Sequence, residues 1–108
     1  MKLKEGNPLR LIGSNGEQIT VTVRGTGIVE PPVYVLDDAP WPGGAFTLNK
    51  AARNPSLLTV TLVFTSNSGG SFAIELTGSQ GGVSRYQYNQ KTNEASRVTN
   101  FLLDVNGP

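Results

Sequence analysis

The sequence predicts an all-β domain built as an antiparallel two-sheet β-sandwich. Apolar and polar residues alternate with a period of two along several segments, as they do in half-buried strands. Glycine-rich and Asn-Gly turns separate these segments at short intervals. No segment keeps a helical apolar period for three turns. We therefore expect about eight short strands, connected as in an immunoglobulin-like or jelly-roll sandwich, with a small β-barrel as the rival architecture.

The alternation is clearest at residues 17–24 and 71–77, where three apolar residues share one face of each segment. The expected inward residues are Ile19, Val21, Val23, Phe72, Ile74 and Leu76. Residues 57–65 are apolar on both faces, which indicates a central strand. The shorter candidates are residues 9–12, 33–36, 45–49, 83–89 and 98–105.

The turns between these segments predict how the strands connect. Asn15-Gly16 suits a tight hairpin turn, so we expect residues 9–12 to pair with residues 19–23. Two glycine-rich loops flank residues 71–77, which predicts a three-stranded meander over residues 57–89. Prolines place residues 30–32 and 38–44 at a sheet edge or in crossings between sheets. Residues 49–54 allow at most one helical turn before Pro55.

Length and composition restrict the function. A chain of 108 residues corresponds to a single sandwich domain over residues 1–108. It has no Cys and no His, so zinc sites, disulfides and His-dependent catalysis are excluded, and we expect no cofactor and no enzyme activity. A net charge of +1 gives no reason to expect a nucleic-acid partner. The sequence shows neither a membrane span nor a signal-peptide pattern, so we expect a cytoplasmic protein or a trimmed extracellular one.

Trp41 is the single tryptophan and stands between two prolines. A tryptophan on a stiff loop could stack against a sugar ring or a partner side chain, with little entropy to lose. The alternative is that Trp41 plugs one open end of the sandwich, and we favour this reading because tryptophan is usually largely buried.

Tyr86 and Tyr88 share one face of their strand, and Arg85, Gln87 and Asn89 share the other. Exposed tyrosines would form a saccharide-sized aromatic pair. We favour tyrosines in the core, because Val83 alone would give the other face too little apolar surface. The exposed polar row would then adjoin the outer residues of the preceding strand, which are Ala73, Glu75 and Thr77.

Asp37 and Asp38 form the one pair of adjacent carboxylates. They could contribute to a calcium site, but the sequence has no calcium-loop motif. A turn-capping role for Asp38 ahead of Ala39-Pro40 is favoured, and no metal site is expected.

Two functions of different classes remain open. The first is a non-catalytic, lectin-like binding module for a glycan, with ligand contacts from Trp41, Tyr86, Tyr88, Arg85, Gln87 and Asn89. The second is a structural or assembly protein of a surface, an appendage or a virion, acting through protein-protein contacts. In the second case the chain could form homo-oligomers through edge strands, and residues 97–105 are the candidate edge.

Overall fold

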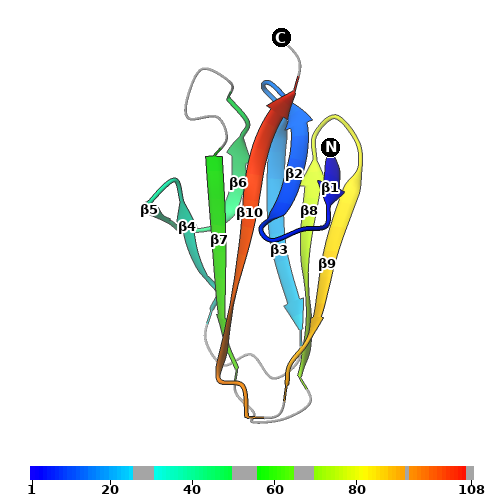
Figure 1. Cartoon of the computed structure of the whole chain (residues 1–108). Helices are drawn as coiled ribbons and strands as arrows, with labels where there is room; N and C mark the ends of the chain where they lie inside the picture. Colours follow the sequence, from blue (N-terminus) through cyan, green and yellow to red (C-terminus); the bar gives the residue numbers. More distant parts are fainter. Residues whose placement is uncertain (26–30, 50–55, 65–69, 92, 107–108) are drawn as a thin grey trace.

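The fold is a β-sandwich (Figure 1). The computed structural model describes residues 1–25, 31–49, 56–64, 70–91 and 93–106. The described strands form a six-stranded sheet, in the order β1-β2-β10-β7-β4-β5, and a four-stranded sheet, in the order β6-β3-β8-β9. Their bounds are β1 Lys2–Lys4, β2 Leu9–Ser14, β3 Gln18–Gly25, β4 Val33–Leu36, β5 Ala39–Trp41, β6 Gly44–Thr47, β7 Ser56–Val63, β8 Ser71–Gly78, β9 Val83–Asn89 and β10 Ser96–Asn106.

The core lies between the two sheets and is built from the predicted inward residues. Ile19, Ile74 and Leu76 of the four-stranded sheet are fully buried, and so are Leu58 and Phe101 of the six-stranded sheet. Each buried side chain of this size stabilises the fold by about 1.5–3 kcal/mol relative to its exposed state. The period-two pattern therefore predicted both the strands and the direction in which their side chains point.

The Asn15-Gly16 turn forms, but the predicted hairpin between residues 9–12 and 19–23 is wrong. The Glu17 N–H donates to the Ser14 carbonyl at 3.1 Å, which closes the turn. The strands on either side belong to different sheets, with β2 in front of β3 in Figure 1. Leu11 and Ile19 are both fully buried and enter the core from opposite layers. The turn thus carries the chain from one sheet to the other, because each strand buries its apolar face against the opposite layer.

The meander predicted over residues 57–89 is correct for its second half only. β8 and β9 pair as a hairpin, with Ile74 opposite Tyr86. β7 lies in the other sheet, where it pairs with β10 and β4 and is central, as its two apolar faces indicated. A glycine-rich loop can connect two layers as well as two neighbouring strands, so the loop alone did not decide the pairing.

The expectation that residues 97–105 form a free edge is also wrong. β10 is paired on both sides, antiparallel with β7 and parallel with β2. The parallel pairing runs from Phe101 opposite Leu9 to Asn106 opposite Ser14. Segments so far apart in the sequence give no local signal that they pair. For this reason the backbone groups of residues 97–105 were expected to lack a partner strand.

The proline-rich residues 38–44 contain the edge strand β5, in agreement with the expectation that prolines would place them at an edge or a crossing. β1, a three-residue strand, was not anticipated. Residues 50–55, which hold most of the predicted helical turn, lie outside the described residues.

A buried carboxylate closes the end of the core beside the β2–β3 turn. Glu17 has no exposed surface. Its Oε1 accepts a hydrogen bond from the Ser14 N–H at 3.1 Å, and its Oε2 lies 3.9 Å from the terminal ammonium of Met1. The side chain fits because Gly78 lacks a Cβ, which at that position would overlap Glu17 Oε2 and lie 3.1 Å from Glu17 Cδ.

Substituting Gly78→Ala is expected to lower the free energy of unfolding by about 1–3 kcal/mol, because the added methyl group displaces a buried carboxylate. Urea denaturation measures the change. Thr77→Ala, on the exposed side of the same strand, should change stability by less than about 0.5 kcal/mol. In a Glu17→Ala background, Gly78→Ala should lower the free energy of unfolding by less, because the carboxylate that the methyl group displaces is absent. An equal cost in both backgrounds would show that the carboxylate is not the obstacle.

Candidate functional site

Trp41 lies at one side of the sandwich, not in a loop or at an open end. It ends β5, just before the chain crosses to β6 in the other sheet. Its ring makes edge-to-face contacts with Tyr34 at 5.4 Å and Phe46 at 5.5 Å between ring centroids. Tyr34 and Phe46 belong to different sheets, so Trp41 closes the gap between the layers at this side. Its role as a ligand contact stays a prediction.

Tyr86 and Tyr88 turn toward the core, which is the reading favoured from the sequence. Both are partly buried against the core cluster. The Tyr88 ring lies 5.2 Å from that of Phe72, and the Tyr86 ring lies 6.4 Å from that of Phe101 in an edge-to-face contact. Tyr86 thereby joins the free side of the four-stranded sheet to β10, whereas the Tyr88 ring packs on β8 within the same sheet.

A polar cluster surrounds the Tyr88 hydroxyl. The hydroxyl donates to the Glu94 carboxylate, at 2.7 Å from Oε1 and 2.9 Å from Oε2. The Arg97 guanidinium stacks on the Tyr88 ring, with its central carbon 4.2 Å from the ring centroid. The hydrogen bond from Tyr88, the Lys91 N–H and the Arg97 charge hold the pKa of Glu94 below its usual value. Burial and the bond to Glu94 raise the pKa of Tyr88.

Arg85, Gln87 and Asn89 form the predicted exposed row on the outer face of the four-stranded sheet. Ala73 pairs with Gln87, and Glu75 pairs with Arg85, so the predicted contact between the two rows is present. Glu75 accepts from Arg85 at 3.2 Å and from Arg24 of β3 at 2.7 Å. Its carboxylate is thus shared by two guanidinium groups.

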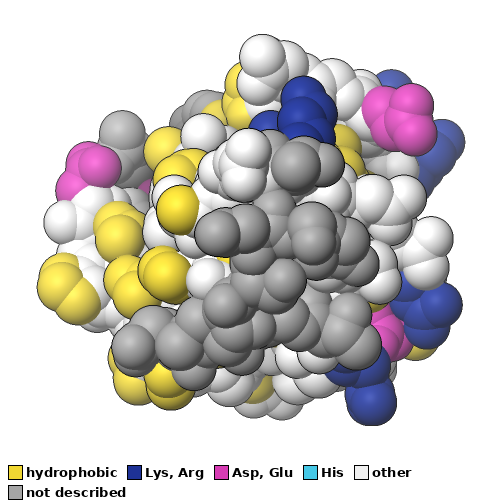
Figure 2. All heavy atoms as spheres, turned by 90° about the horizontal axis from the view of Figure 1, so that it is seen from below, with side chains coloured by type: hydrophobic (Ala, Val, Ile, Leu, Met, Phe, Trp, Pro, Cys, Tyr) yellow, Lys and Arg dark blue, Asp and Glu magenta, His cyan; other side chains and the backbone are white. Residues whose placement is uncertain are grey.

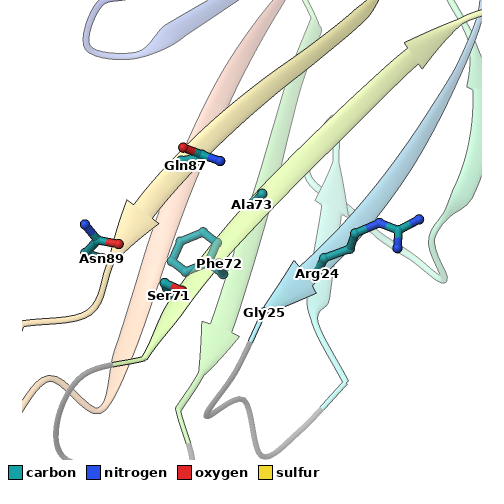
Figure 3. A pocket seen from close by; sticks show the side chains of 7 residues that line it. All are labelled: Arg24, Gly25, Ser71, Phe72, Ala73, Gln87 and Asn89. Atoms are coloured by element: carbon teal, nitrogen blue, oxygen red, sulfur yellow. The ribbon is translucent and has the colours of Figure 1, made fainter.

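A depression of about 310 Å³ lies on this outer face (Figure 3). Gln87 and Asn89 stand on one side of it and Arg24 on the other, with Ser71 and Ala73 of β8 between them. The hollow exists because small residues of the middle strand lie between long side chains of its two neighbours. We call this feature the outer depression, and its lining residues are Arg24, Gly25, Ser71, Phe72, Ala73, Gln87 and Asn89.

Two of the six predicted site residues, Gln87 and Asn89, line the outer depression, and Arg85 lies on the same face. Trp41, Tyr86 and Tyr88 do not line it. Sequence reasoning missed Arg24 and Ser71 as site residues. The alternation along residues 17–24 puts Arg24 on the other face from the inward Val23, but only the long-range pairing of β3 with β8, in which Arg24 faces Ala73, brings it to the site.

Asp37 and Asp38 form the two-residue turn between β4 and β5. Both have positive φ, 51° and 66°, as the central residues of a primed hairpin turn require. The Asp37 carboxylate accepts a hydrogen bond from the Leu57 N–H at 2.9 Å. Within the described parts of the chain no group of three or more acidic side chains is placed to hold a metal ion, and no helix there is long and apolar enough to cross a membrane.

The link between Tyr88 and Glu94 predicts a dependence of stability on pH. Because the pKa of Glu94 is lower in the folded chain, its contribution is present above the ordinary glutamate pKa of about 4.3. The contribution should be lost as the pH falls from there through the folded-state pKa. Glu94→Gln should therefore lower stability at pH 7 and make the acid limb less steep, as measured by urea denaturation across pH 2.5–7. Glu5→Gln is the control, because Glu5 is an exposed carboxylate in the segment between β1 and β2. This account would be contradicted if the free energy of unfolding fell equally steeply with decreasing pH in the wild type and in Glu94→Gln.

Comparisons with models of protein families, with curated protein sequences and with solved structures gave no match for this chain.

Proposed function

We propose that the chain is a non-catalytic, lectin-like binding module and that a carbohydrate binds in the outer depression. The observation that carries the proposal is the arrangement of amide, hydroxyl and guanidinium groups around a floor of small residues. Sugar hydroxyls both donate and accept hydrogen bonds, and the side chains of Gln87, Asn89 and Ser71 do the same. Arg24 adds donors at the far wall, next to its ion pair with Glu75.

The electrostatics of the face support binding rather than catalysis. Acid–base catalysis needs a group that can gain or lose a proton next to the substrate. The sequence has no His, and the carboxylate on this face, Glu75, is bonded to Arg24 and Arg85. These contacts favour a fixed hydrogen-bonding surface.

The contacts to the sugar would be hydrogen bonds and not aromatic stacking. Trp41 packs against Tyr34 and Phe46 at another side of the molecule, and Tyr86 and Tyr88 point toward the core. Binding should therefore leave the Trp41 fluorescence unchanged.

The test is a glycan array, followed by NMR titration with the sugars that bind. Gln87→Ala and Asn89→Ala should each weaken binding about two- to tenfold, as expected for the loss of one neutral hydrogen bond. Gln80→Ala is the matched control, because Gln80 is exposed in the β8–β9 turn and outside the depression. The proposal fails if no glycan binds, or if the Gln80 and Gln87 variants weaken binding equally.

A second candidate is a structural protein that assembles through its six-stranded sheet. Val33 and Val98 are 55% and 53% exposed, and they lie on either side of Thr61 in one row across β4, β7 and β10. Figure 2 shows hydrophobic side chains gathered at the side of the molecule where β4 and β5 lie. Two exposed valines in one row on a sheet face favour contact with a second copy.

Light scattering over a range of concentrations tests this candidate. If the row mediates assembly, Val33→Lys and Val98→Lys should reduce the mass observed at high concentration. Val83→Lys should not, because Val83 is 62% exposed but lies on the other sheet. A strict monomer at every concentration would exclude assembly through this face.

A further inference from the structure

The described sandwich has four sheet edges, and three of them are protected against pairing with another chain. β1 is three residues long and carries Lys2 and Lys4, and β5 is equally short and contains Pro40. β6 has four residues and begins at Gly44. Short length, lysine and proline are the features by which proteins prevent edge pairing. β9 has seven residues, contains neither proline nor glycine, and pairs with β8 on one side only.

The register of the β8–β9 hairpin shows which backbone groups of β9 are free. The Gln90 N–H donates to the Gly70 carbonyl at 2.7 Å, and the Gly78 N–H donates to the Gly82 carbonyl at 3.1 Å. In an antiparallel pair, bonded and non-bonded positions alternate. Tyr86 therefore bonds back to β8, whereas Arg85 and Gln87 direct their N–H and C=O groups away from it.

These free backbone groups face a groove. A depression of about 510 Å³ lies between β9 and the N-terminal segment, and Arg85, Tyr86 and Gln87 line it opposite Leu3, Glu5 and Leu9. A second depression of about 270 Å³ shares Leu9 and Tyr86 with the first and extends along the start of β10. Together they form what we call the β9 groove, which follows the free edge of the strand.

Arg97 lines the far part of the β9 groove. Its guanidinium carbon lies 4.2 Å from the centroid of the Tyr88 ring, and Tyr86 accepts a hydrogen bond from it. Among the residues that the structure describes, no carboxylate lies within ion-pair distance of Arg97, and its Nε has no hydrogen-bond partner. A half-buried cation in a polar groove is suited to a carboxylate.

The geometry points to a docking site for an extended peptide of a partner protein, which adds a strand to the free edge of β9 and places a carboxylate near Arg97. The backbone N–H and C=O groups of Arg85 and Gln87 bond to the peptide. Leu3, Leu9 and Tyr86 contact its apolar side chains. The site shares Gln87 with the outer depression, but it uses the backbone of this residue and not its side chain, so the inference does not rest on carbohydrate binding.

A second copy of the chain fits the β9 groove less well. Two β9 strands could pair across a twofold axis, but residues 83–89 contain no Asp or Glu. Such a pair would leave Arg97 without a carboxylate from the added strand. Arg97 is attracted by Glu94 but has no carboxylate of the described residues within ion-pair distance, and it therefore favours a peptide that carries an acidic side chain or a free C-terminus.

The probe is a pool of randomised hexapeptides with free C-terminal carboxylates, added to the isotope-labelled protein. NMR-detected hydrogen exchange follows the Arg85 and Gln87 amides, which should exchange fast in the free protein and slowly in the complex. The same pool with C-terminal amides should bind about tenfold more weakly, because a charge-assisted hydrogen bond is lost. Peptides N-methylated at every residue should not bind, because neither of their edges keeps the N–H groups that pairing with β9 requires.

Two variants separate the backbone contacts from the side chains. Arg85→Pro removes an N–H that points away from β8, so the fold should tolerate it while peptide binding is lost. Arg85→Ala retains the N–H and should retain binding. Arg97→Gln should abolish the preference for carboxylates over amides.

The inference is overturned if no peptide slows exchange at Arg85 and Gln87, or if N-methylated peptides bind equally well. Protection of these two amides that grows with protein concentration, without any peptide, would instead assign the groove to a second copy. Glycan binding to the outer depression is unaffected by any of these results, so the two proposals fail separately.

Discussion

The side chains of β8 alternate between the two faces of its sheet, and the rest of the molecule depends on this constraint. Phe72, Ile74 and Leu76 fill the core, and Ala73 and Glu75 therefore lie on the outer surface. Because β8 is central, both of its neighbours take their register from it. A shift by one residue would expose the core residues and also dismantle the outer depression. Stability and the candidate site are thus fixed by the same pairing.

A second contact network holds the free side of the four-stranded sheet to the other layer. Tyr86 reaches Phe101, and Tyr88 bonds to Glu94 while Arg97 covers its ring. Without it, β9 would be held only by its pairing with β8 and by a few contacts with β1. The network combines apolar packing toward the core with a charged rim at the surface. It fixes β9 in place while leaving the outer backbone groups of the strand unused, which is the combination that strand addition requires.

Sequence reasoning predicted what depends on local pattern. The segments at residues 33–36 and 83–89 match their strands residue for residue, and the tyrosines of β9 turn inward as favoured. Sequence reasoning failed where distant segments meet. The turn at Asn15-Gly16 has the same chemistry whether it joins neighbouring strands or two layers, and no local signal pairs β2 with β10. Arg24 was missed as a site residue for the same reason, because only the β3–β8 register brings it next to Ala73.

The parallel pairing of β2 with β10 has a mechanical consequence. Their bonds extend from Phe101 opposite Leu9 to Asn106 opposite Ser14. Tension applied at the start of β2 and the end of β10 would slide the two strands along each other, so all bonds of the pair would bear the load together. The antiparallel β1, in contrast, would peel from β2 one bond at a time. A weak force would therefore detach β1 first. Further extension would then require breaking the bonds between β2 and β10 together.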